Sequence, residues 1–267
     1  MLSPNLESVV AQIQPDYIFH LAAYGSLPQQ EAIDPMFDVN VKGTIRLLHA
    51  VKKHPFRLFV HTGSSSEYGI KYKPMKETDI QEPINDYGIS KLAATLYVRK
   101  EAIRYNLPII TFRLFSAYGY FEEPTRFIPW VIARALTNRQ IALTSPTTVR
   151  SFTFIEDIVD TYLLATKSTV TPGDIINIAT KKQYTLGETV AAIMKLTKSK
   201  SSLQWGKHQQ QARQVEKGVW QGNIAHAKAA LAWQPANTLE QGLEKTIQWM
   251  KEHEKAYKDI YFDEAKL

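Results

Sequence analysis

The sequence predicts an α/β fold with a parallel sheet, and two observations carry this prediction. Short apolar runs recur along the first half of the chain, and longer segments with apolar residues at helical spacing separate them. This alternation of strands and helices implies right-handed crossover connections, which place the strands parallel. The length of 267 residues, with 44% hydrophobic and 22% charged residues, suits one large globular domain or two intimate ones and excludes disordered and fibrous classes.

The expected strands are apolar runs with the length of a buried strand. They are 16–22 (DYIFHLA), 57–62 (RLFVHT) and 107–115 (LPIITFRLF). One helix is expected in each gap between strands, where apolar residues recur at helical spacing. The recurring residues are Val41, Ile45, Leu48 and Val51 in the first gap, and Ile89, Leu92, Leu96 and Ile103 in the second.

Four further helices are expected in the second half of the chain. Two are continuous helical patterns, and two open with capping boxes, in which Glu or Gln follows Thr by three residues. They are 127–136, 154–166, the helix after Thr185 with Glu188, and the helix after Thr238 with Gln241. The stretch 199–223, rich in Ser, Gln and Lys, lacks a clear period and is expected to be loop-rich.

The formal net charge of +6 indicates an anionic partner. Its lysines are scattered without an RNP-like or zinc-finger pattern, so a phosphate-bearing small molecule is favoured over nucleic acid. The chain has no cysteine, no run near the roughly 18 apolar residues of a membrane span, and no basic-then-apolar signal at its start. We therefore expect a cytoplasmic protein with no membrane partner. The histidines form no HxxxH or HExxH pair, so no metal site is expected.

Polar, glycine-containing segments follow each of the three expected strands. They are HLAAYGS (20–26), GSSSEYG (63–69) and SAYGYFEEPTR (116–126). Each alone reads as a turn, since Gly and Ser populate turns. Ligands of parallel sheets bind beyond the carboxyl ends of the strands, so the three segments together indicate a binding site there.

Tyr87 and Lys91 in DYGISK carry the sharpest chemical signal. Four residues apart at the start of a helical pattern, they share a face, so the ammonium can lower the pKa of the phenol. A phenolate held in this way can take or give a proton at a sugar or alcohol oxygen near neutral pH. The alternative is an exposed tyrosine near a solvated lysine. Tyr72 and Lys76 have the same spacing, but Pro74 interrupts them.

Six motifs stand along the chain: HLAA (20–23), NVKGT (40–44), GSSSEYG (63–69), YGISK (87–91), RLFSAYG (113–119) and RSFTFIEDIVD (150–160). Their order and intervals resemble those of the extended short-chain dehydrogenase/reductases, specifically the NAD-dependent nucleotide-sugar epimerase/dehydratase group. The closing segment 231–253 resembles the C-terminal helix region of that group. Residues 3–14 resemble the helix that comes just before the strand at 16–22, so a helix is expected there. The resemblance implies a Rossmann-type parallel sheet with a smaller α/β C-terminal substrate-binding region. It assigns 1–115, with a partial return of 146–180, to an incomplete dinucleotide-binding region and 116–267 mainly to substrate.

The resemblance also implies roles for individual residues. Tyr87 matches the catalytic base, Lys91 the residue that lowers its pKa and holds the nicotinamide ribose, and Ser64 the residue that hydrogen-bonds the reacting sugar hydroxyl. The positions implied for an NAD or NADP cofactor are Leu21, Ala22, Ala23, Tyr87 and Lys91. The positions implied for a nucleotide-sugar substrate are Ser65, Ser116, Arg150 and Arg213, the arginines gripping the diphosphate. Asn40 matches either a structural or a proton-relay asparagine.

Two departures from the family pattern affect the expected reaction and the expected cofactor binding. Dehydratases of the group carry an Asp-Glu pair where this chain has Ser65 and Ser66, so an epimerase or a 4-ketoreductase is expected rather than a dehydratase. The glycines never fall within three positions of one another, so no GxxGxxG turn is present, and an N-terminally truncated chain with weakened dinucleotide binding is expected. A non-catalytic nucleotide-sugar-binding remnant is the alternative, and a basic nucleic-acid-associated protein rests on net charge alone.

The resemblance further implies a homodimer. In the group, the helices that correspond to 36–53 and 86–106 pair across a two-fold axis into a four-helix bundle. The apolar residues expected at this contact are Ile45, Leu48, Val51, Leu92, Leu96 and Ile103.

Overall fold

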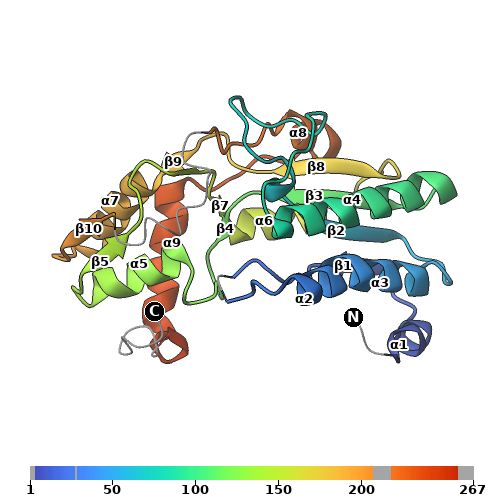
Figure 1. Cartoon of the computed structure of the whole chain (residues 1–267), viewed down its shortest axis with the longest axis horizontal. Coiled ribbons are helices and arrows are strands. Elements are labelled where there is room, and N and C mark those ends of the chain that lie inside the picture. The colour runs from blue at the N-terminus through green and yellow to red at the C-terminus, as the bar shows by residue number, and fades with distance from the viewer. Residues whose placement is uncertain (1–3, 28, 207–217, 258–267) are drawn as a thin grey trace.

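The computed structural model describes residues 4–27, 29–206 and 218–257 (Figure 1). Its larger lobe is built on a parallel sheet in the order β1-β2-β3-β8. These strands are β1 (Tyr17–His20), β2 (Leu58–Ser64), β3 (Ile109–Leu114) and β8 (Asp174–Ile178). The predicted α/β class with a parallel sheet is confirmed, as are the three strands expected from apolar runs.

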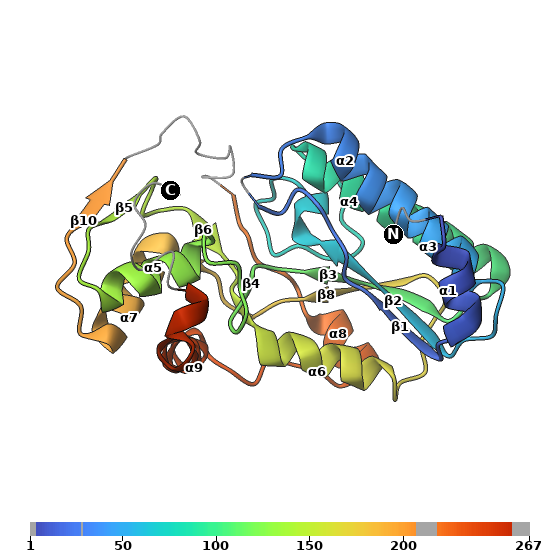
Figure 2. The same ribbon diagram turned by 90° about the horizontal axis from the view of Figure 1, so that it is seen from below.

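Helices cover both faces of this sheet (Figure 2). One face carries α1 (Leu6–Ile13), α2 (Ile33–Phe37), α3 (Thr44–Val51) and α4 (Asp86–Tyr105), with a π-helical turn, η1 (Asp38–Gly43), between α2 and α3. The other face carries α6 (Ile155–Ala165) and α8 (Ala225–Leu231). The helices expected over 3–14, in the two gaps between strands, and over 154–166 are confirmed.

Strand β2 shows why the sheet reads as continuous apolar runs. Leu58 and Val60 pack in the cluster that contains Ile158 of α6, whereas Phe59 between them packs with Val98 of α4. Successive side chains of a strand point to opposite faces, and here both faces are covered by helices. Apolar residues are therefore needed at every position of the strand.

The smaller lobe lies beyond the carboxyl ends of the main strands (Figure 1). It contains α5 (Phe127–Leu136), α7 (Leu186–Thr197), α9 (Leu239–Glu252) and the parallel pair β5 (Ile141–Leu143) and β10 (Leu203–Trp205). The capping boxes predicted at Thr185 and Thr238 are both formed. Strand β10 lies within 199–223, which was expected to be loop-rich. The sequence did not indicate this strand because it is formed by pairing with β5 and shows no apolar periodicity of its own.

Short elements connect the two lobes. They are η2 (Ser65–Glu67), the parallel pair β4 (Ala117–Tyr118) and β7 (Thr153–Phe154), and the antiparallel pair β6 (Val149–Arg150) and β9 (Tyr184–Thr185). A short helical turn, η4 (Glu254–Tyr257), follows α9 in the smaller lobe. Within the residues described above, no helix combines the length and the apolar character needed to cross a membrane.

The apolar surface of α3 and α4 differs from the expected dimer contact. Leu48 and Val51 of α3 are buried inside the chain, in the cluster that α3 forms with α1 and α4, so their assignment to a dimer contact was wrong. Helical periodicity cannot distinguish a face packed within the chain from one that is left outside. The exposed aliphatic residues Ile89, Leu96 and Ile103 of α4 are spaced seven residues apart along one stripe.

Candidate functional site

A cavity of about 630 Å³ opens at the carboxyl ends of β1, β2 and β3. This is where ligands of parallel sheets bind. Its walls come from the segments after β1 and β3, the end of β2 with η2, the first turns of α4, and two arginines of the smaller lobe. Lining residues used below are Leu21, Ala23, Thr62, Ser64, Ser65, Ser66, Tyr87, Lys91, Ser116, Arg126, Arg150 and Trp220.

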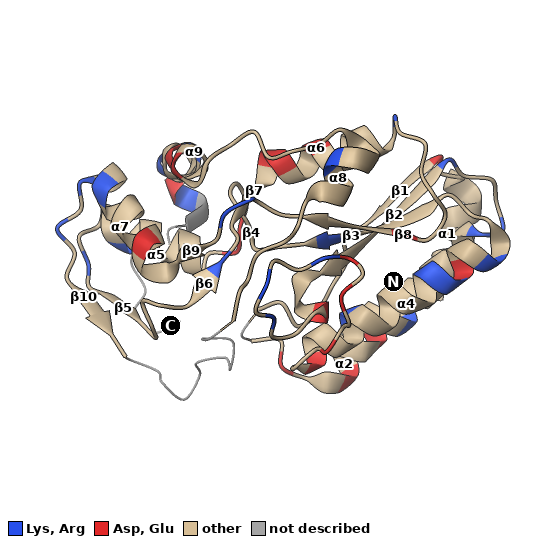
Figure 3. Cartoon of the chain, turned by 90° about the horizontal axis from the view of Figure 1, so that it is seen from above, with Lys and Arg blue, Asp and Glu red and all other residues tan. Residues whose placement is uncertain are grey.

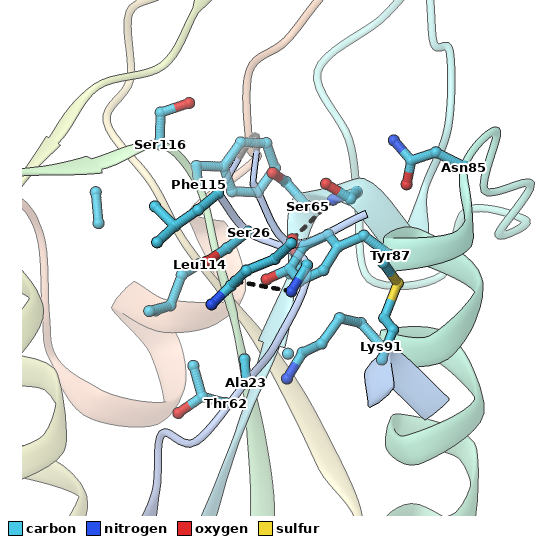
Figure 4. A pocket seen from close by; sticks show the side chains of 18 of the residues that line it. Ala23, Ser26, Thr62, Ser65, Asn85, Tyr87, Lys91, Leu114, Phe115 and Ser116 are labelled. Carbon is cyan, nitrogen blue, oxygen red and sulfur yellow. Dashed lines mark hydrogen bonds between the residues drawn. The ribbon is translucent and has the colours of Figure 1, made fainter. Parts of the chain in front are cut away.

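Tyr87 and Lys91 project from α4 toward the same space (Figure 4). The helix begins where the Asn85 side chain accepts the N–H of Gly88 at 2.7 Å, an N-cap that places Tyr87 in the first turn and Lys91 one turn later. By contrast, Tyr72 and Lys76 lie in a segment without helix, and Tyr72 is 79% exposed. The prediction that only the first pair shares a helix face is confirmed.

Lys91 is almost completely buried, with 2% of its surface exposed. Burial lowers its pKa to about 8, and the negative charge of Glu67 opposes this fall. The ammonium is therefore the main form near neutral pH. A cation one helical turn from Tyr87 stabilises the phenolate relative to the phenol.

Ser64 ends β2 and faces the same cavity. Its Oγ accepts the N–H of Ser66 at 3.1 Å, and its own N–H donates to Oε1 of Glu67 at 2.8 Å. The Ser64 hydroxyl proton is not used in either bond, so it can be donated to an oxygen in the cavity. Ser65 and Ser66 also line the cavity.

The segment after β1 is held by Asn40, which sits in the π-helical turn η1. Asn40 Oδ1 accepts the N–H of Tyr24, and its Nδ2 donates to the Tyr24 carbonyl and to Oγ of Ser90, all at 2.8 to 2.9 Å. Protein groups thus satisfy this buried amide, which supports its structural role. Of the three residues in this segment that were expected near a cofactor, Leu21 and Ala23 line the cavity, whereas Ala22 is exposed and lies outside it.

The substrate positions expected from sequence fall into two groups. Ser65, Ser116 and Arg150 line the cavity, and the Arg150 guanidinium stacks over Trp220 with 5.4 Å between Cζ and the ring centroid. Arg213 lies outside the described residues. Arg126 at the start of α5 also lines the cavity and was not expected from the sequence.

Sequence reasoning also missed Glu67 and Arg113, an ion pair behind the cavity wall with 2.7 Å between Oε2 and Nε. A signal for the pair existed, because Arg113 interrupts an otherwise apolar strand and a buried charge needs a partner. His20 and His61 are buried core residues, and the charge of Lys91 acts on both.

Charged side chains elsewhere among the described residues are scattered and do not gather into a patch of one sign. Basic residues are spread over both lobes, with acidic residues among them on α2 and α4 (Figure 3). Across the part of the chain that the structure describes, no cluster of three or more His, Asp or Glu side chains could hold a metal ion.

Comparisons with known proteins show which family and which enzymes the chain is similar to. The model of the NAD dependent epimerase/dehydratase family matches residues 2–179. An uncharacterized UDP-glucose epimerase of Bacillus subtilis is 25% identical over 253 residues, which cover 94% of this chain and 78% of that protein. A human dTDP-D-glucose 4,6-dehydratase is 27% identical over 229 residues, which cover 83% of this chain and 64% of that protein.

The fold is also that of solved structures. A UDP-glucose 4-epimerase of Thermotoga maritima, solved with UDP-glucose, superposes with a TM-score of 0.86. It is 24% identical, and the match covers 93% of this chain and 81% of that one. This likeness shows that the two chains share a fold.

Proposed function

The chain belongs to the NAD-dependent epimerase/dehydratase family of enzymes, and we propose that it is a nucleotide-sugar 4-epimerase or 4-ketoreductase that uses NAD or NADP. The observation that carries this proposal is that Ser64, Tyr87 and Lys91 line one cavity at the carboxyl ends of parallel strands. Three groups with complementary proton chemistry in one cavity suit reaction at a sugar hydroxyl.

In this proposal, each of the three side chains has one task. The Tyr87 phenolate takes the proton from the C4 hydroxyl of the sugar, or the phenol returns it to the C4 oxygen in the reverse direction. Ser64 donates its free hydroxyl proton to the same oxygen and fixes its position. Lys91, a buried cation one helical turn away, favours the ionised form of Tyr87 over the neutral phenol. The nicotinamide cofactor, when bound, accepts and returns the hydride of the sugar carbon.

The residues beside Lys91 fit the nicotinamide ribose of such a cofactor. The Lys91 ammonium is a buried cation that faces the cavity and can donate to ribose hydroxyls, and Leu21 and Ala23 offer small apolar contacts next to it. No GxxGxxG turn is present in the 267 residues, so the pyrophosphate half of the cofactor has no such cradle in this sequence.

The nucleotide end of the substrate is assigned to Arg150 and Arg213. Arg150 reaches the cavity from β6, and a planar, permanently charged guanidinium suits diphosphate oxygens. Ser116 and Ser65 offer hydroxyl groups to the sugar. Dehydration is disfavoured because Ser65 and Ser66 supply neither the acid nor the base that elimination of water requires.

The direct experiment follows UDP-glucose and UDP-galactose by proton NMR in the presence of the chain and NAD. Interconversion of the two sugars supports an epimerase, and NADPH-dependent reduction of a 4-keto nucleotide sugar supports a reductase. Saturable binding of a nucleotide sugar without either reaction favours the alternative, a non-catalytic nucleotide-sugar-binding protein. Absence of binding and of turnover contradicts both.

The chain is further proposed to be a cytoplasmic homodimer that pairs through α4. The apolar stripe of Ile89, Leu96 and Ile103 is 42%, 49% and 56% exposed, and its seven-residue spacing suits helix against helix in an isologous contact. The absence of cysteine suits a reducing compartment. Light scattering of the wild type should give twice the 30.4 kDa chain mass. Leu96→Glu should give the monomer, and a monomeric wild type at micromolar concentration contradicts the proposal.

A further inference from the structure

A buried ion pair lies behind the cavity wall, outside the groups used so far. Glu67 of η2 and Arg113 of β3 are 0% and 1% exposed, and the Tyr68 ring lies 4.6 Å from the Arg113 guanidinium. Removing two charges from water is costly, and such a pair is often no more stabilising than apolar residues of similar volume. The pair therefore gains its interest from its position near Ser64 and Lys91 in the site, since its contribution to the free energy of unfolding is expected to be small.

The Glu67 carboxylate joins three elements that build the site. Its Oε1 accepts the N–H of Ser64 at 2.8 Å and the hydroxyl of Thr95 at 3.0 Å, while Oε2 accepts Nε of Arg113 at 2.7 Å. Thr95 lies one helical turn after Lys91 on α4. One side chain thus ties the end of β2 and the helix of Tyr87 and Lys91 to β3.

The backbone beside the carboxylate leaves room for it. A Cβ on Gly63 would lie 2.6 Å from Oε1 of Glu67, which is closer than real Cβ atoms approach, and 3.0 Å from Cγ2 of Thr111, which is a tight contact. The absence of a side chain at Gly63 lets the carboxylate reach Ser64 and Thr95 together. The space between β2, β3 and α4 is therefore shaped around Glu67.

We propose that Glu67 is a positioning residue: its carboxylate fixes Ser64 relative to the helix of Tyr87 and Lys91 and places a negative charge beside that helix. The expected effect of Glu67 on turnover rests on the proposed function, whereas the effect of the Glu67 charge on Lys91 does not.

The other ionisable groups around Lys91 do not supply this charge. His20 of β1 and His61 of β2 have their pKa values lowered, first by burial and then by Lys91, that of His20 to about 4. Both imidazoles are therefore neutral at pH 7. Arg113 is a cation, so it cannot supply a negative charge. Tyr87 lies on the same helix and is the proposed acid/base group whose ionised form Lys91 favours. Attraction to Glu67 opposes the fall in the Lys91 pKa that burial causes.

The test is a titration of Lys91 in the free protein, which needs no substrate. Lysine labelled with ¹³C at Cε is followed by NMR against pH, and the Lys91 signal is assigned by its loss in Lys91→Met. The wild-type midpoint is expected at about 8. Glu67→Gln should lower it by about one unit or more, since an opposite charge at close range shifts a pKa by about 1–3 units.

Glu101→Gln is the matched control. Glu101 is also a nearly buried acid in an ion pair, 3% exposed, and it lies on the same helix, but its partners are Lys52 and Lys100. Its removal should leave the Lys91 midpoint near 8. An unchanged midpoint in Glu67→Gln, or an equal shift in Glu101→Gln, overturns the assignment of charge to Glu67.

Two further variants complete the test. If Glu67→Gln does not fold because Arg113 is left unpaired, Glu67→Gln with Arg113→Met removes both buried charges. The midpoint should still fall, but by less, because loss of the Arg113 cation offsets part of the loss of Glu67. Thr95→Val removes one hydrogen bond but keeps the charge, so it should reduce kcat about tenfold with the midpoint kept near 8. An unchanged kcat overturns the positioning role. A wild type without turnover contradicts the proposed function instead, and leaves the result of the titration standing.

Discussion

Gly88→Ala tests whether close packing of α4 against η2 sets the position of Tyr87. A Cβ at Gly88 would lie 2.5 Å from the Ser66 carbonyl oxygen and 3.0 Å from Cβ of Pro83. Ordinary contact begins at 3.4 Å, and the oxygen belongs to the backbone. The first turn of α4 and η2 must therefore separate by about 0.9 Å, and a misplacement of about 1 Å can reduce catalysis about 100-fold.

Gly88→Ala should destabilise the chain, although replacing an ordinary helical glycine by alanine stabilises a protein. Ala in place of Gly stabilises a helix by about 1 kcal/mol when space allows, whereas overpacking costs about 1–3 kcal/mol. Gly88→Ala should therefore lower the free energy of unfolding and reduce kcat for the nucleotide sugar about 100-fold. Urea unfolding and the NMR turnover assay measure the two effects.

Gly187→Ala is the matched control, because Gly187 also lies in the first turn of a helix, α7, away from the cavity. Its nearest contact for a Cβ is the Pro146 carbonyl oxygen at 3.2 Å, which needs to move by only a few tenths of an ångström. This variant should keep wild-type kcat. Wild-type stability and turnover in Gly88→Ala, or equal losses in both variants, would refute the packing argument.

Two other predictions concern the smaller lobe and its boundary with the cavity. Arg150→Met should weaken UDP binding about 10- to 100-fold, since one charge-assisted hydrogen bond contributes about 1.5–3 kcal/mol, and an unchanged Kd in calorimetry would remove Arg150 from the diphosphate site. Burial raises the pKa of Glu122 to about 7 against the attraction of Arg126. The folded chain then keeps a proton that the unfolded chain releases, so stability should fall as pH rises from about 4.5 to about 7 and level off above. Glu122→Gln should remove this fall, and identical pH profiles of thermal unfolding in both proteins would contradict it.

Local signals allowed much of the fold to be predicted. Helix α5 spans the predicted residues 127–136, and the capping boxes at Thr185 and Thr238 open α7 and α9, because a cap depends on residues three positions apart. Strands β8 and β10 were not identified as strands. Their pairing partners, β3 and β5, lie about 60 residues away in the chain. Ile175, Ile176 and Ile178 are a local signal for β8 that was missed, whereas the three residues of β10 are too few to show one.

The residues of the candidate site also fall into those that local motifs predict and those that only long-range contacts reveal. Ser64, Tyr87 and Lys91 could be found because each stands in a motif just after a strand or at the start of a helix. The Glu67–Arg113 pair joins residues 46 positions apart, so its geometry could not be read from either segment alone.

The central claim is that Tyr87 is the acid/base group of a nucleotide-sugar site. Turnover of UDP-sugar by Tyr87→Phe and by Tyr72→Phe, compared with the wild type under identical conditions, tests it most directly. Loss of a positioned acid/base group should reduce kcat about 100-fold or more in Tyr87→Phe. Tyr72 is 79% exposed and outside the cavity, so Tyr72→Phe should retain wild-type turnover. Full activity of Tyr87→Phe, or equal losses in the two variants, would contradict the claim.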